Sequence, residues 1–315
     1  YPRELYDIIV ISDQMQESTN EALRQLPVRL LIADYTDSSK AKAMSLAMNA
    51  TADIPYDAVV IMDADNTAGT SFLSELNPVF QSGARAVQAH RTAKNTNTDI
   101  AVLDAASEEI NNSIFRSGHI ALGLSSALIG SGMALEACWF RQHIHLLETA
   151  GEDKEMEALL LKQRIHIEYL EHVYVKDEKT QKKEGIKNQR KRWIAAQFDS
   201  LVRALPDFPK ELLRGNIDYC DKVFQWTLLP RIILIFCTFF FTILVTLVSP
   251  YSSIKWWILA FALFLALFTA IPGHLLNKQL LRAIFQLPSL LLGIASNLFK
   301  LKGVNKKFIH TEHGN

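Results

Sequence analysis

Two long apolar runs near the C-terminal end of the chain set the strongest limit on its fold. They read RIILIFCTFFFTILVTLV (231–248) and WWILAFALFLALFTAI (256–271), and neither holds a charged residue after the opening Arg231. With its flanks, each run approaches the roughly 20 helical residues that cross a bilayer core. A buried helical hairpin in a soluble domain is the alternative, but such a domain rarely needs two runs joined only by SPYSSIK. We therefore predict two transmembrane helices within residues 226–273 of an integral membrane protein.

A third apolar segment, LLRAIFQLPSLLLGIASNLF (280–299), is interrupted by Pro288 and followed by the basic stretch KLKGVNKK. If it crossed the bilayer, this stretch and the basic loop before it would lie on opposite sides, against the positive-inside tendency. The segment instead predicts an amphipathic helix in the cytoplasmic interface. We assign residues 274–315 to this helix and a basic tail, and residues 209–225 to an interfacial linker.

The first 208 residues alternate strand-like and helix-like segments. In chain order these read DIIVIS, TNEALRQL, VRLLIA, KAKAMSLAMNATA and DAVVIM. Apolar β-branched runs predict the strands, and helical spacing predicts the segments between them. The β-α-β-α-β order favours a mostly parallel, twisted sheet with helices on both faces. Residues 1–208 are therefore expected to form one α/β domain.

Acidic side chains stand where two of these strands end. Asp13 ends the first, and Asp63 and Asp65 follow the third in the stretch AVVIMDADNTAG. In open sheets of this kind, ligands bind beyond the carboxyl ends of the strands. Negative charge gathered there is unfavourable unless a cation or a hydrogen-bonding ligand is bound. The pattern predicts a binding site at this edge.

Two later motifs have an ordinary explanation when each is taken alone. Gly130, Ser131 and Gly132 form a run that lets the backbone approach a ligand closely, although a simple turn explains it as well. Glu152 and Asp153 open a helix, where the helix dipole favours acids without any function.

A third motif lies on the last predicted helix before the apolar runs. Gln189, Arg192 and Trp193 have the spacing that places them on one helix face. An amide, a guanidinium and an indole presented together suit phosphate oxygens and a sugar ring. A plain surface helix with a half-buried tryptophan is the simpler explanation.

Charge and cysteine content exclude other classes of protein. The formal net charge is zero, which gives no case for nucleic-acid binding. Cys138, Cys220 and Cys237 lack metal-ligand spacing, so we expect free thiols in a reducing compartment.

Taken in order, these motifs resemble a known family. The order is Asp13, Lys42, Asp63-Ala64-Asp65, Gly130-Ser131-Gly132, Glu152-Asp153 and Gln189-Arg190-Lys191-Arg192-Trp193, followed by the apolar runs. It resembles the membrane-bound family 2 glycosyltransferases, which include the cellulose, chitin, hyaluronan and poly-N-acetylglucosamine synthases. The resemblance implies a GT-A type, Rossmann-like nucleotide-sugar-binding domain followed by transmembrane helices. It also implies an integral protein of the bacterial inner (cytoplasmic) membrane with its catalytic domain in the cytoplasm.

The resemblance assigns the donor side of the site. Asp65 and Asp63 look like the pair that holds Mg²⁺ or Mn²⁺ against the diphosphate of a UDP-sugar. Arg192 and Gln189 look like stabilisers of the departing diphosphate. Asp13 matches the aspartate that contacts the uracil or ribose, and Lys42 matches the lysine on the nucleotide side.

The acceptor side is assigned in the same way. Asp153, beside Glu152, matches the general base that takes the proton of the acceptor hydroxyl. A single displacement would then invert an α-linked donor into a β-linked product. Trp193 would stack against the acceptor sugar, and Gly130, Ser131 and Gly132 would line the acceptor site.

The two ends of the chain carry further points of comparison. FIHTEH, with Phe308, Thr311 and His313, is similar to the gating loop of cellulose synthases, although an ordinary polar tail fits too. The chain opens at YPRELYDIIVISD without Met, and the family's first strand and usual N-terminal membrane helix are missing, so we expect an N-terminal truncation. Gly151 stands where Thr commonly precedes Glu-Asp.

The favoured function is an inverting, metal-dependent transfer from a UDP-sugar to a glycan acceptor, in polysaccharide synthesis at the membrane. One alternative adds a single sugar to a polyprenyl phosphate lipid. Another is a non-catalytic membrane scaffold or transport component, against which the intact Asp63, Asp65 and Asp153 argue. The expected partners are a UDP-sugar, a glycan or lipid-linked acceptor, the bilayer and a possible export or accessory subunit.

Overall fold

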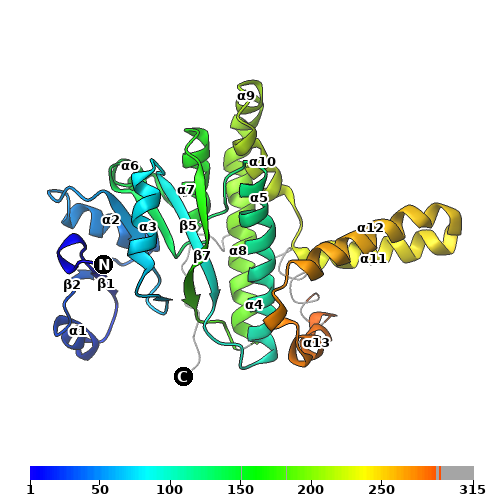
Figure 1. Ribbon diagram of the computed structural model, residues 1–315, viewed down its shortest axis with the longest axis horizontal. Helices are drawn as coiled ribbons and strands as arrows, with labels where there is room; N and C mark the ends of the chain where they lie inside the picture. The colour runs from blue at the N-terminus through cyan, green and yellow to red at the C-terminus, as the bar shows by residue number, and fades with distance from the viewer. Residues whose placement is uncertain (150, 182, 289–290, 292–315) are drawn as a thin grey trace.

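The computed structural model describes residues 1–149, 151–181, 183–288 and 291 (Figure 1). The predicted strands and helices at the start of the chain are confirmed as elements. They are β1 (Ile9–Asp13), α1 (Glu17–Arg24), β2 (Arg29–Ala33), α2 (Lys40–Ala50) and β3 (Ala58–Ile61). The side chain of Ser39 accepts a hydrogen bond from the Lys42 backbone nitrogen at 3.2 Å and so caps α2. This cap begins the helix at Lys40.

The remaining elements complete the α/β domain and lead into the apolar helices. In the α/β domain they are β4 (Thr67–Ala68), α3 (Phe72–Gln81), β5 (Ala86–Ala93), α4 (Asp99–Asn112), α5 (Gly118–Ala121), β6 (Met133–Glu136), α6 (Ala137–His143), α7 (Glu152–Lys162), β7 (Ile167–Asp177) and α8 (Lys183–Ala204). After them come α9 (Phe208–Leu213), α10 (Ile217–Thr227), α11 (Arg231–Val248), α12 (Pro250–Thr269) and α13 (Lys278–Ile284). A π-helical segment, Ser113–Ser117, joins α4 to α5.

The prediction of a mostly parallel sheet is wrong for the larger sheet. β1 and β2 pair in parallel as a two-stranded sheet, whereas β3 lies in a separate five-stranded sheet of order β3-β6-β5-β7-β4. In the described residues, β6 runs antiparallel to β3 and β5, and β4 runs antiparallel to β7, so only β5 and β7 are parallel. The β-α-β rule fails here because β6, four residues long, enters between β3 and β5 directly after the Gly130–Gly132 turn. The GT-A arrangement stays a prediction.

The five-stranded sheet is buried on both faces. Val87 of β5 and Val175 of β7 pack with Phe72 and Leu76 of α3 on one face. The main core lies on the other face and joins α2, β3, β6, α6, α7, α8 and α10. Within the segment expected to be an interfacial linker, α10 buries Tyr219 in this core. Burial of both faces holds the loops at the strand ends in place.

The α11–α12 hairpin projects away from the α/β domain (Figure 1). Both helices are long and apolar enough to cross a membrane, by length and composition, and most of their surface is exposed. Their exposed side chains include Phe236, Leu247, Ile258 and Phe261. Apolar surface of this extent is unfavourable in water and suits a lipid environment.

Helix α13 lies against α4, and Leu280 packs on Val102 and Ala106. α13 occupies the start of the segment predicted to be an amphipathic interfacial helix. Residues 289–290 and 292–315, which include the end of that predicted helix and the motif of Phe308, Thr311 and His313, lie outside the described residues.

Candidate active site

One cavity brings together most of the residues that the sequence singled out. It has a volume of about 1670 Å³ and opens between the α/β domain and the apolar helices. Eight of the predicted site residues line it: Asp63, Asp65, Gly130, Glu152, Asp153, Gln189, Arg192 and Trp193. The chain supplies them from the loop after β3, the loop before β6, the first turn of α7 and one face of α8. The acids share a cavity with residues suited to phosphate and sugar.

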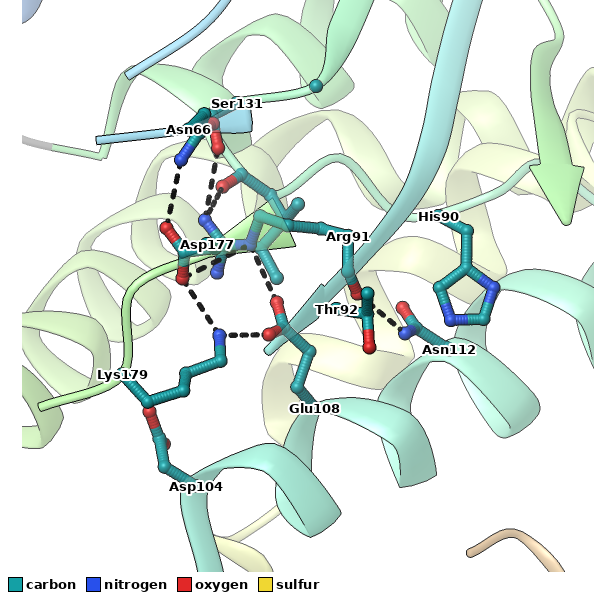
Figure 2. Close-up of polar contacts among 12 residues, drawn as sticks. Asn66, His90, Arg91, Thr92, Asp104, Glu108, Asn112, Ser131, Asp177 and Lys179 are labelled. Atoms are coloured by element: carbon teal, nitrogen blue, oxygen red, sulfur yellow. Dashed lines mark hydrogen bonds and ion pairs between the residues drawn. The ribbon is translucent and has the colours of Figure 1, made fainter. Parts of the chain in front are cut away.

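Asn66 fixes the turn that carries the two aspartates. The Asn66 backbone nitrogen donates to the Asp63 carbonyl at 3.0 Å, and the Asp63 nitrogen donates to Asn66 Oδ1 at 3.3 Å. The side-chain nitrogen of Asn66 donates to Asp65 Oδ1 at 3.1 Å and to Asp177 Oδ1 at 3.0 Å. Figure 2 shows the second contact. Asn66 therefore ties Asp65 to the end of β7.

Lys40 supplies positive charge at the bottom of the site. Its ammonium group forms an ion pair with Asp63 and donates to the Gly130 carbonyl at 2.7 Å. The capped start of α2 places this side chain in the cavity. Lys42, which the resemblance assigned to the nucleotide, instead donates to the Asp37 carbonyl. Only the first of these two lysines lines the cavity.

Gly130 lets the loop before β6 come close to the carboxylates of α7. Its φ of +81° favours glycine, and a Cβ there would lie 3.8 Å from Glu152 Oε1, 3.9 Å from Asp153 Oδ2 and 3.9 Å from Lys40 Nζ. The two carboxylates, the lysine and this backbone segment thus surround one small region of the cavity.

The two acids of α7 differ in their surroundings. Burial, together with the neighbouring carboxylate of Asp153, raises the pKa of Glu152 to about 7, although Lys40 opposes the shift. Burial lowers the pKa of the Arg192 guanidinium, and the charge of Glu152 opposes this effect. Glu152 is thus partly protonated near neutral pH. A buried carboxyl group whose pKa is raised in this way suits proton transfer.

The face of α8 carries an unsatisfied acceptor and an aromatic ring. Gln189 Oε1 is buried and has no hydrogen-bond partner within the described part of the chain. Trp193 is 36% exposed, and the guanidinium carbon of Arg190 lies 4.9 Å from its ring centroid. A buried carbonyl oxygen without a partner is costly, so a ligand that donates to Gln189 would be stabilised.

An ionic network of Arg91, Glu108, Asp177 and Lys179 lines the same cavity (Figure 2). Arg91 of β5 donates to Glu108 of α4 at 2.6 Å and to Ser131 Oγ at 3.2 Å. Lys179 forms ion pairs with Glu108 and, at 2.8 Å, with Asp177. Burial alone would raise the pKa of Glu108, but the charges of Arg91 and Lys179 lower it to about 2. The network links β5, α4 and the end of β7, where Asn66 is also bound.

Four predicted site residues lie apart from the cavity lining, which includes none of Asp13, Lys42, Ser131 and Gly132. Asp13 accepts a hydrogen bond from Ser38 Oγ at 2.7 Å. Ser131 is fully buried, and its hydroxyl accepts a hydrogen bond from Arg91. Gly132, with φ +62°, packs against Val175.

Sequence reasoning missed Lys40, Asn66 and the network of Arg91, Glu108, Asp177 and Lys179. For Lys40 a signal existed, because Ser39 is a good helix N-cap and places the next residue in the first turn. Glu108 and Lys179 gave no signal, since charged residues 71 positions apart show no local pattern.

A divalent cation in this cavity would depend on Asp63 and Asp65. Asp63 and Asp65 line the same cavity, and no group of three or more His, Cys, Asp or Glu side chains suited to a metal occurs among the described residues. A pair of carboxylates is what Mg²⁺ needs when substrate phosphates and water complete its shell. The present ion pair of Asp63 with Lys40 would have to adjust.

The sequence comparison identifies the class. The profile of the glycosyl transferase family group 2 matches residues 58–269, more than half of the chain. The chain belongs to this family. No curated protein matches the chain.

Among solved structures, one similar chain carries the description "Crystal Structure of a Mycobacterial Protein". The TM-score is 0.43 at 13% identity. The match covers 62% of this chain and 64% of the mycobacterial one, so this chain spans less than two thirds of that protein.

Proposed function

We propose that the protein is an inverting, metal-dependent glycosyltransferase that moves a sugar from a UDP-sugar to a hydroxyl of a glycan acceptor and forms a β-linkage. The observation that carries this proposal is the shared cavity of Asp63, Asp65, Asp153 and the α8 residues. Family membership supplies the reaction class, and the arrangement of charges supports the individual roles.

The donor diphosphate belongs near Asp63, Asp65 and Lys40. Asp65 and Asp63 would hold Mg²⁺ or Mn²⁺, which supplies charge neutralisation for the diphosphate when bound. Lys40 and Arg192 add positive charge from the chain itself. One contact between opposite charges at 4 Å is worth about 4 kcal/mol at an effective dielectric near 20, which is a useful share of a barrier.

Proton transfer belongs to the first turn of α7. Asp153 takes the proton of the acceptor hydroxyl. At the same time the hydroxyl oxygen of the acceptor bonds to the anomeric carbon of the donor sugar, and the bond from that carbon to the UDP oxygen breaks. Asp153 accepts a hydrogen bond from the Lys154 backbone nitrogen at 2.9 Å, which orients one carboxylate oxygen. Glu152, with a pKa near 7, lies beside it and can hydrogen-bond as an acid. Trp193 gives the acceptor sugar a flat apolar surface.

The bilayer is the proposed setting. Helices α11 and α12 would cross the membrane, which places the α/β domain and its cavity at one interface. Catalysis would occur on the cytoplasmic side of the inner membrane, where UDP-sugars are available. Synthesis of a polysaccharide then requires export, and an accessory subunit could provide it.

Sugar transfer can be tested directly on the full chain. We would reconstitute the protein in nanodiscs, supply a panel of labelled UDP-sugars with Mg²⁺ or Mn²⁺, and follow release of UDP and of labelled product. The proposal predicts turnover of one sugar class, loss of turnover in excess chelator, and a β-anomeric product by NMR. Turnover that persists in chelator, or an α-linked product, would overturn the metal or inversion assignment.

A further inference from the structure

Arg231 stands at the boundary between the polar and apolar parts of the cavity. It opens α11, and residues of α4, α11, α12 and α13 beyond it form an apolar wall continuous with the carboxylate region. This wall includes Ile110, Ile235, Leu267 and Leu281. A polar glycan gains little from contact with an apolar wall, whereas a hydrocarbon chain is stabilised by it because its apolar surface leaves water.

Among the described residues, the positive charge of Arg231 is not balanced by an acid. Its guanidinium donates to the Ser107 carbonyl at 3.2 Å, to Ser107 Oγ at 3.4 Å and to Asn111 Oδ1. All three partners are neutral, and within the described ranges no carboxylate forms an ion pair with Arg231. A partly buried charge without a counter-ion is unfavourable, so this site is suited to an anion.

A chain of contacts joins Arg231 to the acceptor face of α8. Arg190 donates to the same Ser107 hydroxyl at 3.2 Å and to Asp104 at 2.8 Å. The Arg190 guanidinium in turn lies over the ring of Trp193. An anion held at Arg231 would therefore lie next to the surface proposed for the acceptor sugar.

We propose that Arg231, with Ser107 and Asn111, binds the phosphate of a lipid that carries the acceptor into the site. The hydrocarbon chain lies against the apolar wall of α4, α11, α12 and α13, and the sugar attached to the phosphate reaches Trp193. Arginine matches the geometry of phosphate oxygens, and the start of a membrane helix is the level at which lipid phosphates occur. This inference rests on the proposed glycosyl transfer and names the class of its acceptor.

The test measures binding of hexadecyl phosphate to the full-length protein in phosphatidylcholine nanodiscs, with bound lipid counted by native mass spectrometry. We expect the wild type to retain hexadecyl phosphate and Arg231→Gln to bind it at least tenfold more weakly, since a charged hydrogen bond is lost. Arg231→Lys should recover part of the affinity. Lys255→Gln, which removes an exposed cation of α12, should bind like the wild type.

Further arms identify the ligand. Hexadecanol at the same concentration should fail to compete, and inorganic phosphate should compete only at far higher concentration. Equal binding by Arg231→Gln, competition by hexadecanol, or equal competition by inorganic phosphate would overturn the proposal. Leu267→Trp, which fills the space beside the apolar wall and keeps Arg231, should also weaken binding of hexadecyl phosphate. If Arg231→Gln does not fold, unchanged binding by Leu267→Trp would overturn the proposal.

Failure of the proposed function gives a different pattern. If the wild type releases no UDP from any UDP-sugar yet retains hexadecyl phosphate through Arg231, the transfer proposal fails and the lipid site stands.

Discussion

Two lysines two residues apart show how one residue decides the electrostatics of the site. Lys40 forms an ion pair with Asp63 and contacts the Gly130 carbonyl, whereas Lys42 bonds a carbonyl in the loop before α2. The resemblance assigned Lys42 because it depends on the order of residue types along the sequence. It takes no account of where helix α2 begins. Helix phase places only the first lysine in the cavity.

Substitution of the two lysines separates these assignments. Lys40→Gln removes the cation beside Asp63, so we expect UDP release from a UDP-sugar to fall by about 10²-fold, the size seen for lost transition-state contacts. Lys42→Gln should stay within about twofold, because its ammonium group contacts the Asp37 carbonyl and the Tyr35 ring and does not line the cavity. Steady-state UDP release measures both. A larger loss for Lys42→Gln would restore the motif-based assignment.

At the scale of elements, the contact between α7 and α8 determines where Glu152 and Asp153 lie. A Cβ on Gly151 would come within 2.7 Å of the Ala196 Cβ, which is closer than real atoms approach. Gly151 therefore lets α8 pack against the first turn of α7, and this explains why glycine replaces the threonine expected from the family pattern. The pair positions Glu152 and Asp153 relative to Arg192.

A pair of variants tests this contact. Gly151→Ala should lower the free energy of unfolding by about 1–3 kcal/mol through overpacking, and should reduce sugar transfer because α7 shifts. Adding Ala196→Gly removes the clashing methyl group and should recover most of the transfer. Thermal unfolding in detergent and UDP release are the measurements. Unchanged transfer in Gly151→Ala would show that the two helices are not held so closely.

The network at Glu108 predicts a dependence of stability on pH. The folded-state pKa of Glu108, about 2, is below its ordinary value of 4.5, so its contribution to stability is present above pH 4.5 and is lost as the pH falls towards 2. Glu108→Gln removes one of the two carboxylates that Arg91 and Lys179 share and leaves them only Asp177, which costs about 3 kcal/mol at neutral pH. The gap between wild type and variant, measured by thermal unfolding, should narrow in acid.

A surface glutamate provides the control. Glu21→Gln, on the exposed side of α1, should change the free energy of unfolding by less than about 0.5 kcal/mol. A gap between wild type and Glu108→Gln that stays constant from pH 7 to pH 3 would contradict the network account.

The elements that the sequence predicted were those with strong local signals. Strands β1, β2 and β3 and the apolar helices α11 and α12 follow from runs of apolar residues. β6 could not be predicted, because four residues give almost no periodic signal. Its antiparallel placement depends on the turn at Gly130–Gly132. Eight residues of the ordered motifs line one cavity, and their roles stay a prediction. Contacts between distant charges, such as Glu108 with Lys179, arise only from the tertiary fold.

At the scale of the whole molecule, the native cysteines report how the chain lies relative to a bilayer. Cys138 is exposed on the α/β domain, whereas Cys237 lies within α11. A water-soluble maleimide should label Cys138 in inside-out membrane vesicles and not in sealed right-side-out ones, and should leave Cys237 unlabelled in both. Variants with a single cysteine make the readout unambiguous.

Two outcomes would contradict this topology. Labelling of Cys237 at the rate of Cys138 would place α11 in water. Labelling of Cys138 only in right-side-out vesicles would place the catalytic domain outside the cell.

The central claim is that two aspartates of one cavity have different roles. Asp65 binds the donor diphosphate through a metal, and Asp153 takes the proton of the acceptor hydroxyl. Binding of UDP by calorimetry, with and without Mn²⁺, followed by UDP-sugar turnover on the same samples, tests it most directly. We predict that Asp153→Asn keeps Mn²⁺-dependent UDP binding and loses turnover by at least 10²-fold, whereas Asp65→Asn loses the Mn²⁺-dependent binding itself. Normal turnover by Asp153→Asn, or unchanged Mn²⁺-dependent binding by Asp65→Asn, would contradict the account.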